Sequence, residues 1–227
     1  MTTASGDSMT CSDGDSVAAA VLVGGSSRRM GTPKAMLRVP EHGPSMLERV
    51  VRVLRLCAGQ VMLVGSPESK YPLEVADLPF VVDAGAGPVG GLIAALRASN
   101  HPSVLLVACD LPFLSEEVAR LMIARAVMLR RGVCPRIGTV NGSQTLQPLV
   151  AVYRRDDVEE IVSLFNAGER SLVGIVTALQ MAMAPVEDIL AIDAELWSFF
   201  NVNTPEDLDV ARRHALLCER NDDDTLA

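Results

Sequence analysis

The chain has 227 residues, enough for one substantial α/β domain. Its formal net charge of -8 argues against a protein that grips nucleic acid through a broad basic surface. Aromatic residues make up only 4% of the chain, so base stacking on aromatic platforms is not expected either. We therefore expect a single globular domain that holds any anionic ligand through a few local groups.

The cysteines and the two ends of the chain indicate the class of protein. The five cysteines are widely spaced, odd in number and form no C-x-x-C pair, which predicts reduced thiols in a cytoplasmic protein. Residues 1–16 lack the features of a signal peptide and predict a disordered tail, and residues 218–227 predict an acidic tail. No uncharged apolar stretch approaches membrane-spanning length, so we expect one domain over 17–217 and no membrane contact.

The first half of the chain alternates between predicted strands and helices. The predicted strands are continuous apolar runs rather than alternating ones, which is typical of strands buried on both faces of a parallel sheet. They span residues 17–23, 60–65, 79–83 and 103–110. Apolar residues at helical spacing predict helices over 45–57 and 90–98.

The second half is less regular but continues the pattern. Ser115 precedes two glutamates and predicts the N-cap of a helix over 115–130. The other expected helices are 156–168 and 204–217, the expected strands are 147–153 and 180–186, and the expected loops are 40–44 and 133–145. The sequence thus predicts a three-layer α/β/α, Rossmann-like fold with a mostly parallel sheet, which binds ligands beyond the carboxyl ends of its strands.

One stretch, VLVGGSSRRMGTPKAML, follows the first predicted strand and suits a polyphosphate. Gly24 and Gly25 let a ligand approach the main chain, whose N–H groups can cradle phosphate oxygens. Arg28, Arg29 and Lys34 add positive charge at the same place. The alternative interpretation is a glycine-rich turn whose basic residues are simply solvated.

Two familiar phosphate-binding motifs do not fit this stretch. A Walker loop needs adjacent Gly-Lys followed by Ser or Thr, whereas Lys34 lies between Pro33 and Ala35. The dinucleotide fingerprint G-x-G-x-x-G is also absent from the stretch.

Two oxygen-bearing side chains are candidates for binding a metal ion. Asp110 ends a predicted strand, where a carboxylate can bind Mg²⁺ that is shared with substrate phosphates, or can cap the following turn. Asn203 in FNVNTPE could complete the coordination of the metal or hold an acceptor. It could equally support the turn before the last helix, and residues Asn201 and Asn203 could face the same side of an extended segment.

Three further positions leave alternatives open. Asp83 and the glycines after it could approach a base or ribose closely, or form a plain strand-to-helix connection. Arg170, followed by Ser171, could meet the phosphate of an acceptor or be a solvated helix-end residue. Cys109 has apolar neighbours and no histidine close in sequence, so we expect an inert buried thiol. The three histidines form no metal-binding pattern.

The glycine-rich stretch resembles the signature loop of the MobA-like nucleotidyltransferases. The matching residues are Leu22, Gly24, Gly25, Ser27, Arg28 or Arg29, Met30, Gly31 and Lys34. Three later segments resemble motifs of that family in the same order: AGPVGGL, ACDLPFL and FNVNTPEDL. The resemblance covers about residues 17–214 and implies a nucleotidyltransferase fold.

The resemblance implies Mg²⁺-dependent transfer of GMP from GTP to molybdenum-bearing molybdopterin, with release of pyrophosphate. The implied partners are GTP, molybdopterin and proteins that mature molybdoenzymes. The implied catalytic residues are Lys34, Arg28, Arg29 and Asp110; the implied nucleotide-binding residues are Leu22, Val23, Gly24, Gly25, Lys34, Asp83, Gly87, Pro88, Gly90 and Asp110; and the implied metal ligands are Asp110 and Asn203.

Two departures from the family pattern keep other substrates open. Val23 stands where the family usually has Ala, and Thr32-Pro33 precedes Lys34 where guanylyltransferases commonly have Asp. The Gly24-Gly25 pair resembles the guanylyl branch more than the cytidylyl branch. The alternatives are a cytidylyltransferase or sugar nucleotidyltransferase, another phosphorylated acceptor, and a non-catalytic nucleotide-binding accessory protein.

Overall fold

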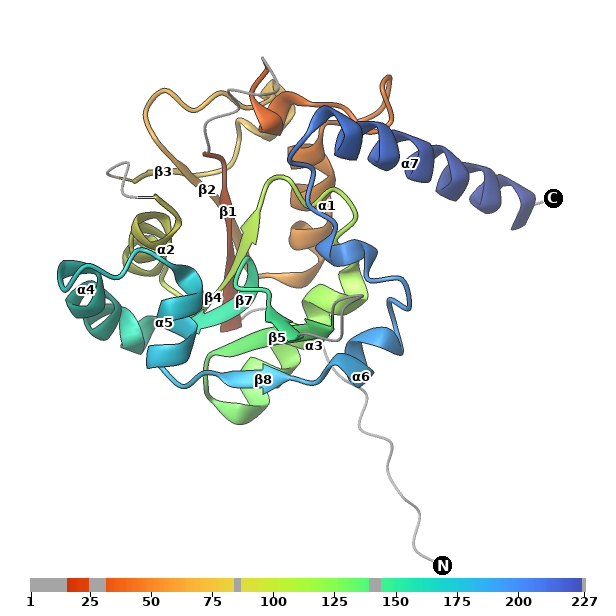
Figure 1. Ribbon diagram of the computed structural model, residues 1–227. Coiled ribbons are helices and arrows are strands. Elements are labelled where there is room, and N and C mark those ends of the chain that lie inside the picture. Colours follow the sequence, from red (N-terminus) through yellow and green to blue (C-terminus); the bar gives the residue numbers. More distant parts are fainter. Residues whose placement is uncertain (1–15, 25–31, 84–86, 139–143, 226–227) are drawn as a thin grey trace, which may run out of the picture.

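A mixed β-sheet forms the centre of the molecule. The computed structural model describes residues 16–24, 32–83, 87–138 and 144–225 (Figure 1). In these parts the sheet has eight strands: β1 (Val17–Leu22), β2 (Gln60–Gly65), β3 (Phe80–Val82), β4 (Ser103–Ala108), β5 (Val133–Gly138), β6 (Gln144–Leu146), β7 (Val150–Arg154) and β8 (Ala182–Ala184). Their order is β3-β2-β1-β4-β7-β5-β6, and β8 pairs with β5.

The half of the sheet that the sequence predicted best is parallel. β3, β2, β1 and β4 all run in the same direction, whereas β7 pairs with β4 in the antiparallel direction. Leu22 lies opposite both Val64 and Ala108, so β1, β2 and β4 end at the same edge. The Rossmann-like arrangement with a mostly parallel sheet is therefore confirmed.

Helices cover both faces of the sheet and make the three layers (Figure 1). The helices are α1 (Met46–Cys57), α2 (Gly87–Ala98), α3 (Glu116–Leu129), α4 (Val158–Asn166), α5 (Leu172–Ala178), α6 (Val186–Leu190) and α7 (Pro205–Thr225). Residues of α1 and α3 share one hydrophobic cluster with the sheet, and residues of α2, α4 and α5 share a second cluster on the opposite face.

The alternation of side chains along the central strands explains their continuous apolar sequence. In β1, Val21 belongs to the cluster beneath α1 and α3, while Ala20 belongs to the cluster beneath α2. The neighbouring strand repeats this division, since Leu63 faces the first cluster and Met62 the second. Both faces of each strand are buried, so both sets of side chains must be apolar.

Local capping signals place the helices that flank the strand ends. At the start of α1 the Ser45 hydroxyl accepts a hydrogen bond from the Glu48 N–H, and the Glu48 carboxylate accepts one from the Ser45 N–H. This reciprocal pair satisfies two donors that the helix leaves unpaired. Ser115 accepts from the Val118 N–H at 3.1 Å, which confirms the N-cap predicted for α3.

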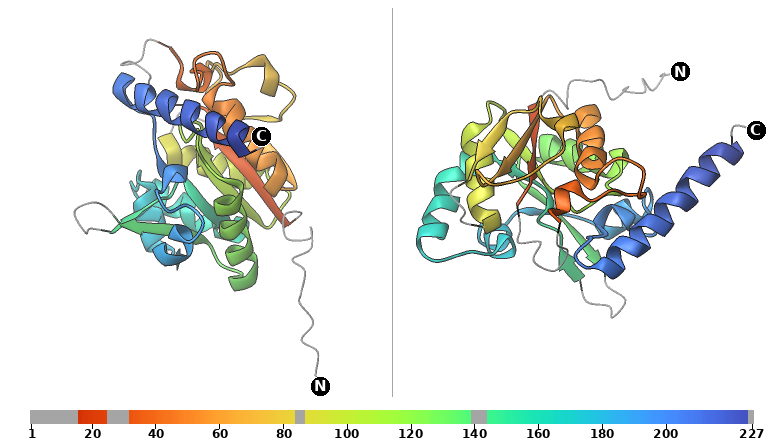
Figure 2. Two further views of the ribbon diagram at one scale, coloured as in Figure 1. Left: turned by 90° about the vertical axis from the view of Figure 1, so that its right-hand side faces the viewer. Right: turned by 90° about the horizontal axis from the view of Figure 1, so that it is seen from above.

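Two expectations for the second half were wrong in detail. The predicted loop over 133–145 contains β5 and β6, because Cys134 and Ile137 are buried and the segment pairs with β7 and β8. The final helix was predicted to end at residue 217, whereas α7 continues to Thr225 and extends away from the sheet (Figure 2). Among the described residues, no helix combines the length and apolar character that a bilayer-crossing segment needs.

Candidate active site

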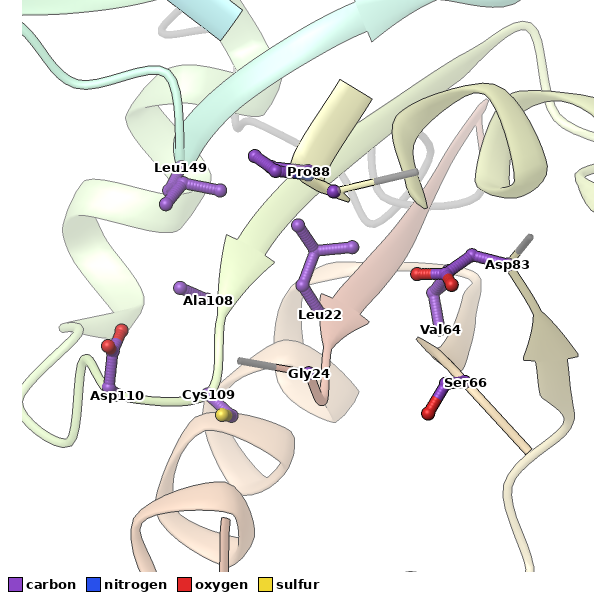
Figure 3. Close-up of a pocket in the computed structure, with 11 residues that line it drawn as sticks. Leu22, Gly24, Val64, Ser66, Asp83, Pro88, Ala108, Cys109, Asp110 and Leu149 are labelled. Carbon is purple, nitrogen blue, oxygen red and sulfur yellow. The ribbon is translucent and has the colours of Figure 1, made fainter. Parts of the chain in front are cut away.

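A pocket lies where the parallel strands end, and we call it the strand-end pocket. It has a volume of about 350 Å³. Its lining residues are Leu22, Gly24, Val64, Ser66, Asp83, Gly87, Pro88, Ala108, Cys109, Asp110 and Leu149. Figure 3 shows Asp83 and Asp110 on opposite sides of it, with Leu22 and Gly24 between them. The two acidic side chains therefore mark the two ends of the space that a ligand would fill.

Two of the lining residues of the pocket are glycines, Gly24 and Gly87. A methyl group added at Gly24 would meet no atom of the described residues beyond its chain neighbours within 4 Å. Gly87 begins α2 with a φ of +72°, a left-handed conformation that side chains rarely adopt. The N-terminus of α2, including Gly87 and Pro88, thus borders the pocket, where its partial positive charge favours an anion.

Three side chains from distant parts of the chain meet beside the pocket. The Lys34 ammonium donates to Oδ2 of Asp110 at 2.7 Å and to Oδ1 of Asn203 at 2.6 Å. The side chains of Lys34 and Asp110 are 19% and 15% exposed, so this ion pair is largely shielded from water. The ammonium therefore stands between the carboxylate and amide oxygens that the sequence proposed as metal ligands.

Backbone hydrogen bonds bring these side chains together. The Val202 N–H donates to the Asp110 carbonyl at 3.0 Å and fixes the approach of the segment that bears Asn203. The Asp207 carboxylate then accepts from the N–H groups of Asn203 and Thr204, each at 2.9 Å. Burial works to raise the pKa of Asp207, but these backbone hydrogen bonds outweigh it and lower the pKa below its usual range.

The residues present suit Mg²⁺ coordination by oxygen. Oδ1 of Asp110 is buried and has no hydrogen-bond partner among the described residues. Among the described residues, here or elsewhere, no group of three His, Cys, Asp or Glu side chains could hold a metal ion. A divalent cation here would therefore depend on Asp110, an amide oxygen and the ligand's own phosphates, which is the usual way that Mg²⁺ binds.

The Asp83 end of the pocket depends on a close helix–strand contact. The Asp83 N–H donates to the Gly65 carbonyl at 2.8 Å, continuing the strand pairing beyond β3. A methyl group at Gly91 of α2 would lie 2.7 Å from Cδ2 of Leu22 and 3.6 Å from Oδ2 of Asp83. Glycine at position 91 therefore lets α2 approach the end of β1 and leaves room for both pocket side chains.

Cys109 lines the pocket but does not have the properties of a nucleophile. Burial raises the pKa of its thiol to about 12, and the neighbouring charge of Asp110 acts in the same direction. A thiol with this pKa stays protonated near neutral pH, and only the thiolate attacks efficiently. The burial of the Cys109 side chain supports the expectation of an inert buried thiol.

Several implied site residues lie elsewhere or cannot be placed. Gly25, Arg28 and Arg29 lie outside the described residues, so their roles stay predictions. The side chain of Val23 is buried in the cluster beneath α1 and α3, and the backbone N–H of Val23 donates to the Val64 carbonyl. Gly90 lies in the first turns of α2 and is not among the residues that line the pocket.

Arg170, which had two open interpretations, interacts with its own neighbourhood. Its guanidinium donates to the carbonyls of Phe165 and Glu169 and lies 4.0 Å from the centroid of the Phe165 ring. It does not line the strand-end pocket, and Ser171 caps α5 by accepting from the Gly174 N–H. These contacts favour a role at the α4–α5 junction over contact with a ligand in the described pocket.

Other pocket residues were missing from the predicted site. Ser66 directly follows β2, and Leu149 directly precedes β7. The rule that ligands bind beyond the carboxyl ends of parallel strands would have found Ser66. Nothing local in the sequence marks Leu149, because it reaches the pocket only through the antiparallel pairing of β7 with β4.

The strand order reverses between β1 and β4, and the strand-end pocket lies at the carboxyl ends of these two strands, where open α/β sheets such as the nucleotide-binding ones hold their ligands. Comparison of the sequence with known families identifies the class of protein. Residues 19–184 match the model of the MobA-like NTP transferase domain, and the chain belongs to this family of nucleotidyltransferases.

Individual relatives resemble the chain over most of its length. A probable molybdenum cofactor guanylyltransferase of Pelotomaculum thermopropionicum is 36% identical over 194 residues, covering 85% of this chain and 90% of that protein. Another from Chloroflexus aggregans is 34% identical over 195 residues, covering 86% and 92%. The crystal structure of molybdopterin-guanine dinucleotide biosynthesis protein A from Archaeoglobus fulgidus is 27% identical, with a TM-score of 0.70 over 89% of this chain and 99% of that chain.

Proposed function

We propose that this protein transfers GMP from GTP to the molybdenum-bearing molybdopterin cofactor and releases pyrophosphate. The meeting of Lys34, Asp110 and Asn203 beside the strand-end pocket carries this proposal. The names of the relatives from Pelotomaculum thermopropionicum and Chloroflexus aggregans supply the substrate class. The proposed substrates are therefore GTP and molybdopterin, and the proposed cofactor is Mg²⁺.

In this proposal the reaction is a direct displacement at the α-phosphorus of GTP. An oxygen of the acceptor's phosphate forms a bond to the α-phosphorus, while the bond from phosphorus to the bridging oxygen breaks and pyrophosphate leaves with the electron pair. Lys34 offsets the negative charge that develops on the departing group, because a fixed cation acts strongly in a site shielded from water. The protonated thiol of Cys109 fits a mechanism without a covalent enzyme intermediate.

Asp110 and Asn203 would hold Mg²⁺ through their side-chain oxygens. The buried Oδ1 of Asp110, which has no partner in the described chain, supports this assignment. When bound, the ion would supply charge neutralisation between the phosphates. Lys34 already bridges Asp110 and Asn203, so the protein holds its ligand oxygens close together before a nucleotide arrives.

Asp83 supports guanine as the base. A carboxylate only accepts hydrogen bonds, and the Watson–Crick edge of guanine presents two adjacent N–H donors. Asp83 lies at the opposite end of the strand-end pocket from Asp110, so it is separated from the phosphate side. A base that presents two N–H donors to the Asp83 carboxylate would bind better than a base that presents acceptors to it.

The first experiment measures thermal stabilisation of the purified protein by GTP, CTP, ATP and UTP, each with and without Mg²⁺. A ligand that binds only the native state raises its apparent stability. We expect the largest shift with GTP and Mg²⁺, followed by formation of the guanine dinucleotide when molybdopterin is supplied. A larger shift with CTP would contradict the guanylyl proposal.

Asp110→Asn tests the metal and charge assignments in the same assay. This variant should lose nearly all turnover and most of the Mg²⁺-dependent stabilisation by GTP. Asp77→Asn is the matched control, because Asp77 is an exposed acid that pairs with Arg55 and does not line the strand-end pocket. Full turnover by Asp110→Asn would overturn the metal assignment.

A further inference from the structure

The three side chains that meet beside the pocket are carried by segments far apart in sequence. Lys34 is 76 residues from Asp110 and 169 residues from Asn203. Their hydrogen bonds are 2.6–2.7 Å long, so a small relative movement of any one segment would separate them. Something in the protein must therefore hold the three segments in one arrangement.

One arginine on α1 contacts two of these segments directly. Nε of Arg49 donates to the carbonyl of Pro112, two residues after Asp110, at 2.9 Å. Nη1 of the same guanidinium donates to the carbonyl of Val39, in the segment that follows Lys34, at 3.2 Å. A single rigid, planar group thus bridges the two loops from the first turn of a capped helix.

The same guanidinium reaches the third segment through an aromatic ring. It lies 5.4 Å from the centroid of Phe113, in cation–π contact. The ring of Phe113 packs edge-on against His214 of α7, with 4.8 Å between the ring centroids. α7 begins just after Asn203, so Arg49 is linked through Phe113 to the helix that follows the amide.

A hydrophobic cluster joins the same three segments and shows where Arg49 acts. We call it the α7 cluster; its buried members are Val39, Met46, Val202, Leu208, Ala211 and Ala215. Phe113 packs against it. The cluster gives contact between the segments but little directional preference, because apolar packing is not directional. The two hydrogen bonds of Arg49 add the direction.

We propose that Arg49 is a positioning residue that holds the loops after Lys34 and Asp110, and through Phe113 the helix α7, in the arrangement that turnover requires. This inference rests on the proposed function. Arg49 touches neither Lys34 nor Asp110 through any described hydrogen bond, so it acts through Val39, Pro112 and Phe113. Its loss should affect the transfer step more than nucleotide binding, because the strand-end pocket does not include it.

The test compares Arg49→Ala with Arg52→Ala in the full-length protein. Arg52 lies one turn further along α1 and borders the same surface cavity of about 330 Å³, but it has no hydrogen bond or ion pair to a described residue. At saturating GTP and Mg²⁺, Arg49→Ala should lower kcat about 10- to 100-fold, because small misplacements of reacting groups have effects of this size. Its affinity for GTP, read from thermal stabilisation, should change far less, and Arg52→Ala should behave as the unaltered protein does.

Chemical rescue distinguishes positioning from a loss of folding. The cavity beside Arg49 gives a small cation access to the vacated place, so millimolar guanidinium should restore part of the lost kcat in Arg49→Ala. Arg49→Lys should recover little, because a lysine ammonium lacks the planar fork that bridges two carbonyls. Equal losses in Arg49→Ala and Arg52→Ala, or unchanged kcat in Arg49→Ala, would overturn the proposal.

A readout without turnover separates this inference from the proposed function. In thermal unfolding, the destabilisation by Asp110→Asn should be smaller in the Arg49→Ala background than in the unaltered protein, because the Lys34–Asp110 pair is already loosened. Additive costs would refute the positioning role of Arg49 even if no guanylyl transfer were detected. Absence of transfer with clear non-additivity would count against the proposed function alone.

Discussion

The ion pair between Lys34 and Asp110 should contribute measurably to stability as well as to the site. The two charges are 2.7 Å apart, and their side chains are only 19% and 15% exposed. With an effective dielectric constant of about 20, the gross attraction at this distance is about 6 kcal/mol. Partial desolvation and lost side-chain freedom offset most of that, which leaves a coupling of about 1–3 kcal/mol.

A double-mutant cycle with Lys34→Met and Asp110→Asn measures this coupling. Each single variant should lower Tm by about 2–12 °C, since 1 kcal/mol corresponds to about 2–4 °C for a domain of this size. The double variant should lose less stability than the sum of the two single losses. Each single variant leaves one buried charge without its counter-charge, whereas the double variant removes both charges.

The Arg55–Asp77 pair provides the control for this cycle. It has the same 2.7 Å separation, but its side chains are 44% and 68% exposed. Water screens exposed pairs, so its coupling should stay below about 1 kcal/mol. Additive costs at Lys34 and Asp110, or equal couplings for the two pairs, would refute the argument that shielding makes the site pair strong.

Three further predictions concern the pocket and the aromatic contact on α7. Asp83→Asn should weaken GTP binding about 10-fold while changing CTP binding less, as measured by titration calorimetry, because the amide offers one acceptor and an opposing donor. Gly91→Val should push Leu22 into the pocket. We expect a clear loss of GTP affinity in nucleotide titration and only a small change of Tm in thermal melts. Burial lowers the pKa of His214 below its usual 6.5, opposed by Glu195, so the unfolded chain binds the proton more readily. Stability should therefore fall as pH drops through about 6.5, and His214→Gln should flatten this slope in melts followed by protein fluorescence.

The parallel half of the fold was predictable because its signals are local. Runs such as 61–64 and 104–108 are apolar at every position, and burial on both faces explains why. Ser115 marked the start of α3 in the same way, since a cap needs only its own turn. The β5–β6 region was not predictable, because its strands exist only through pairing with distant segments.

In the candidate site too, the residues with local sequence signals were predictable and the contacts between distant segments were not. Asp110 and Lys34 follow strand ends or glycine-rich turns and could be chosen from their neighbours in sequence. Their direct contact with each other could not, because it joins segments that are 76 residues apart in the sequence. Arg49 lacked any signal, since an arginine on an amphipathic helix is indistinguishable by sequence from a solvated one.

The distance of Asn203 from Lys34 along the chain has a consequence for how the enzyme is made. The position of Asn203 depends on Asp207 within α7, whose carboxylate accepts a hydrogen bond from the Asn203 N–H. During synthesis the parallel strands can assemble well before this last segment leaves the ribosome. The nascent chain would then form the strand-end pocket before Asn203 can reach Lys34.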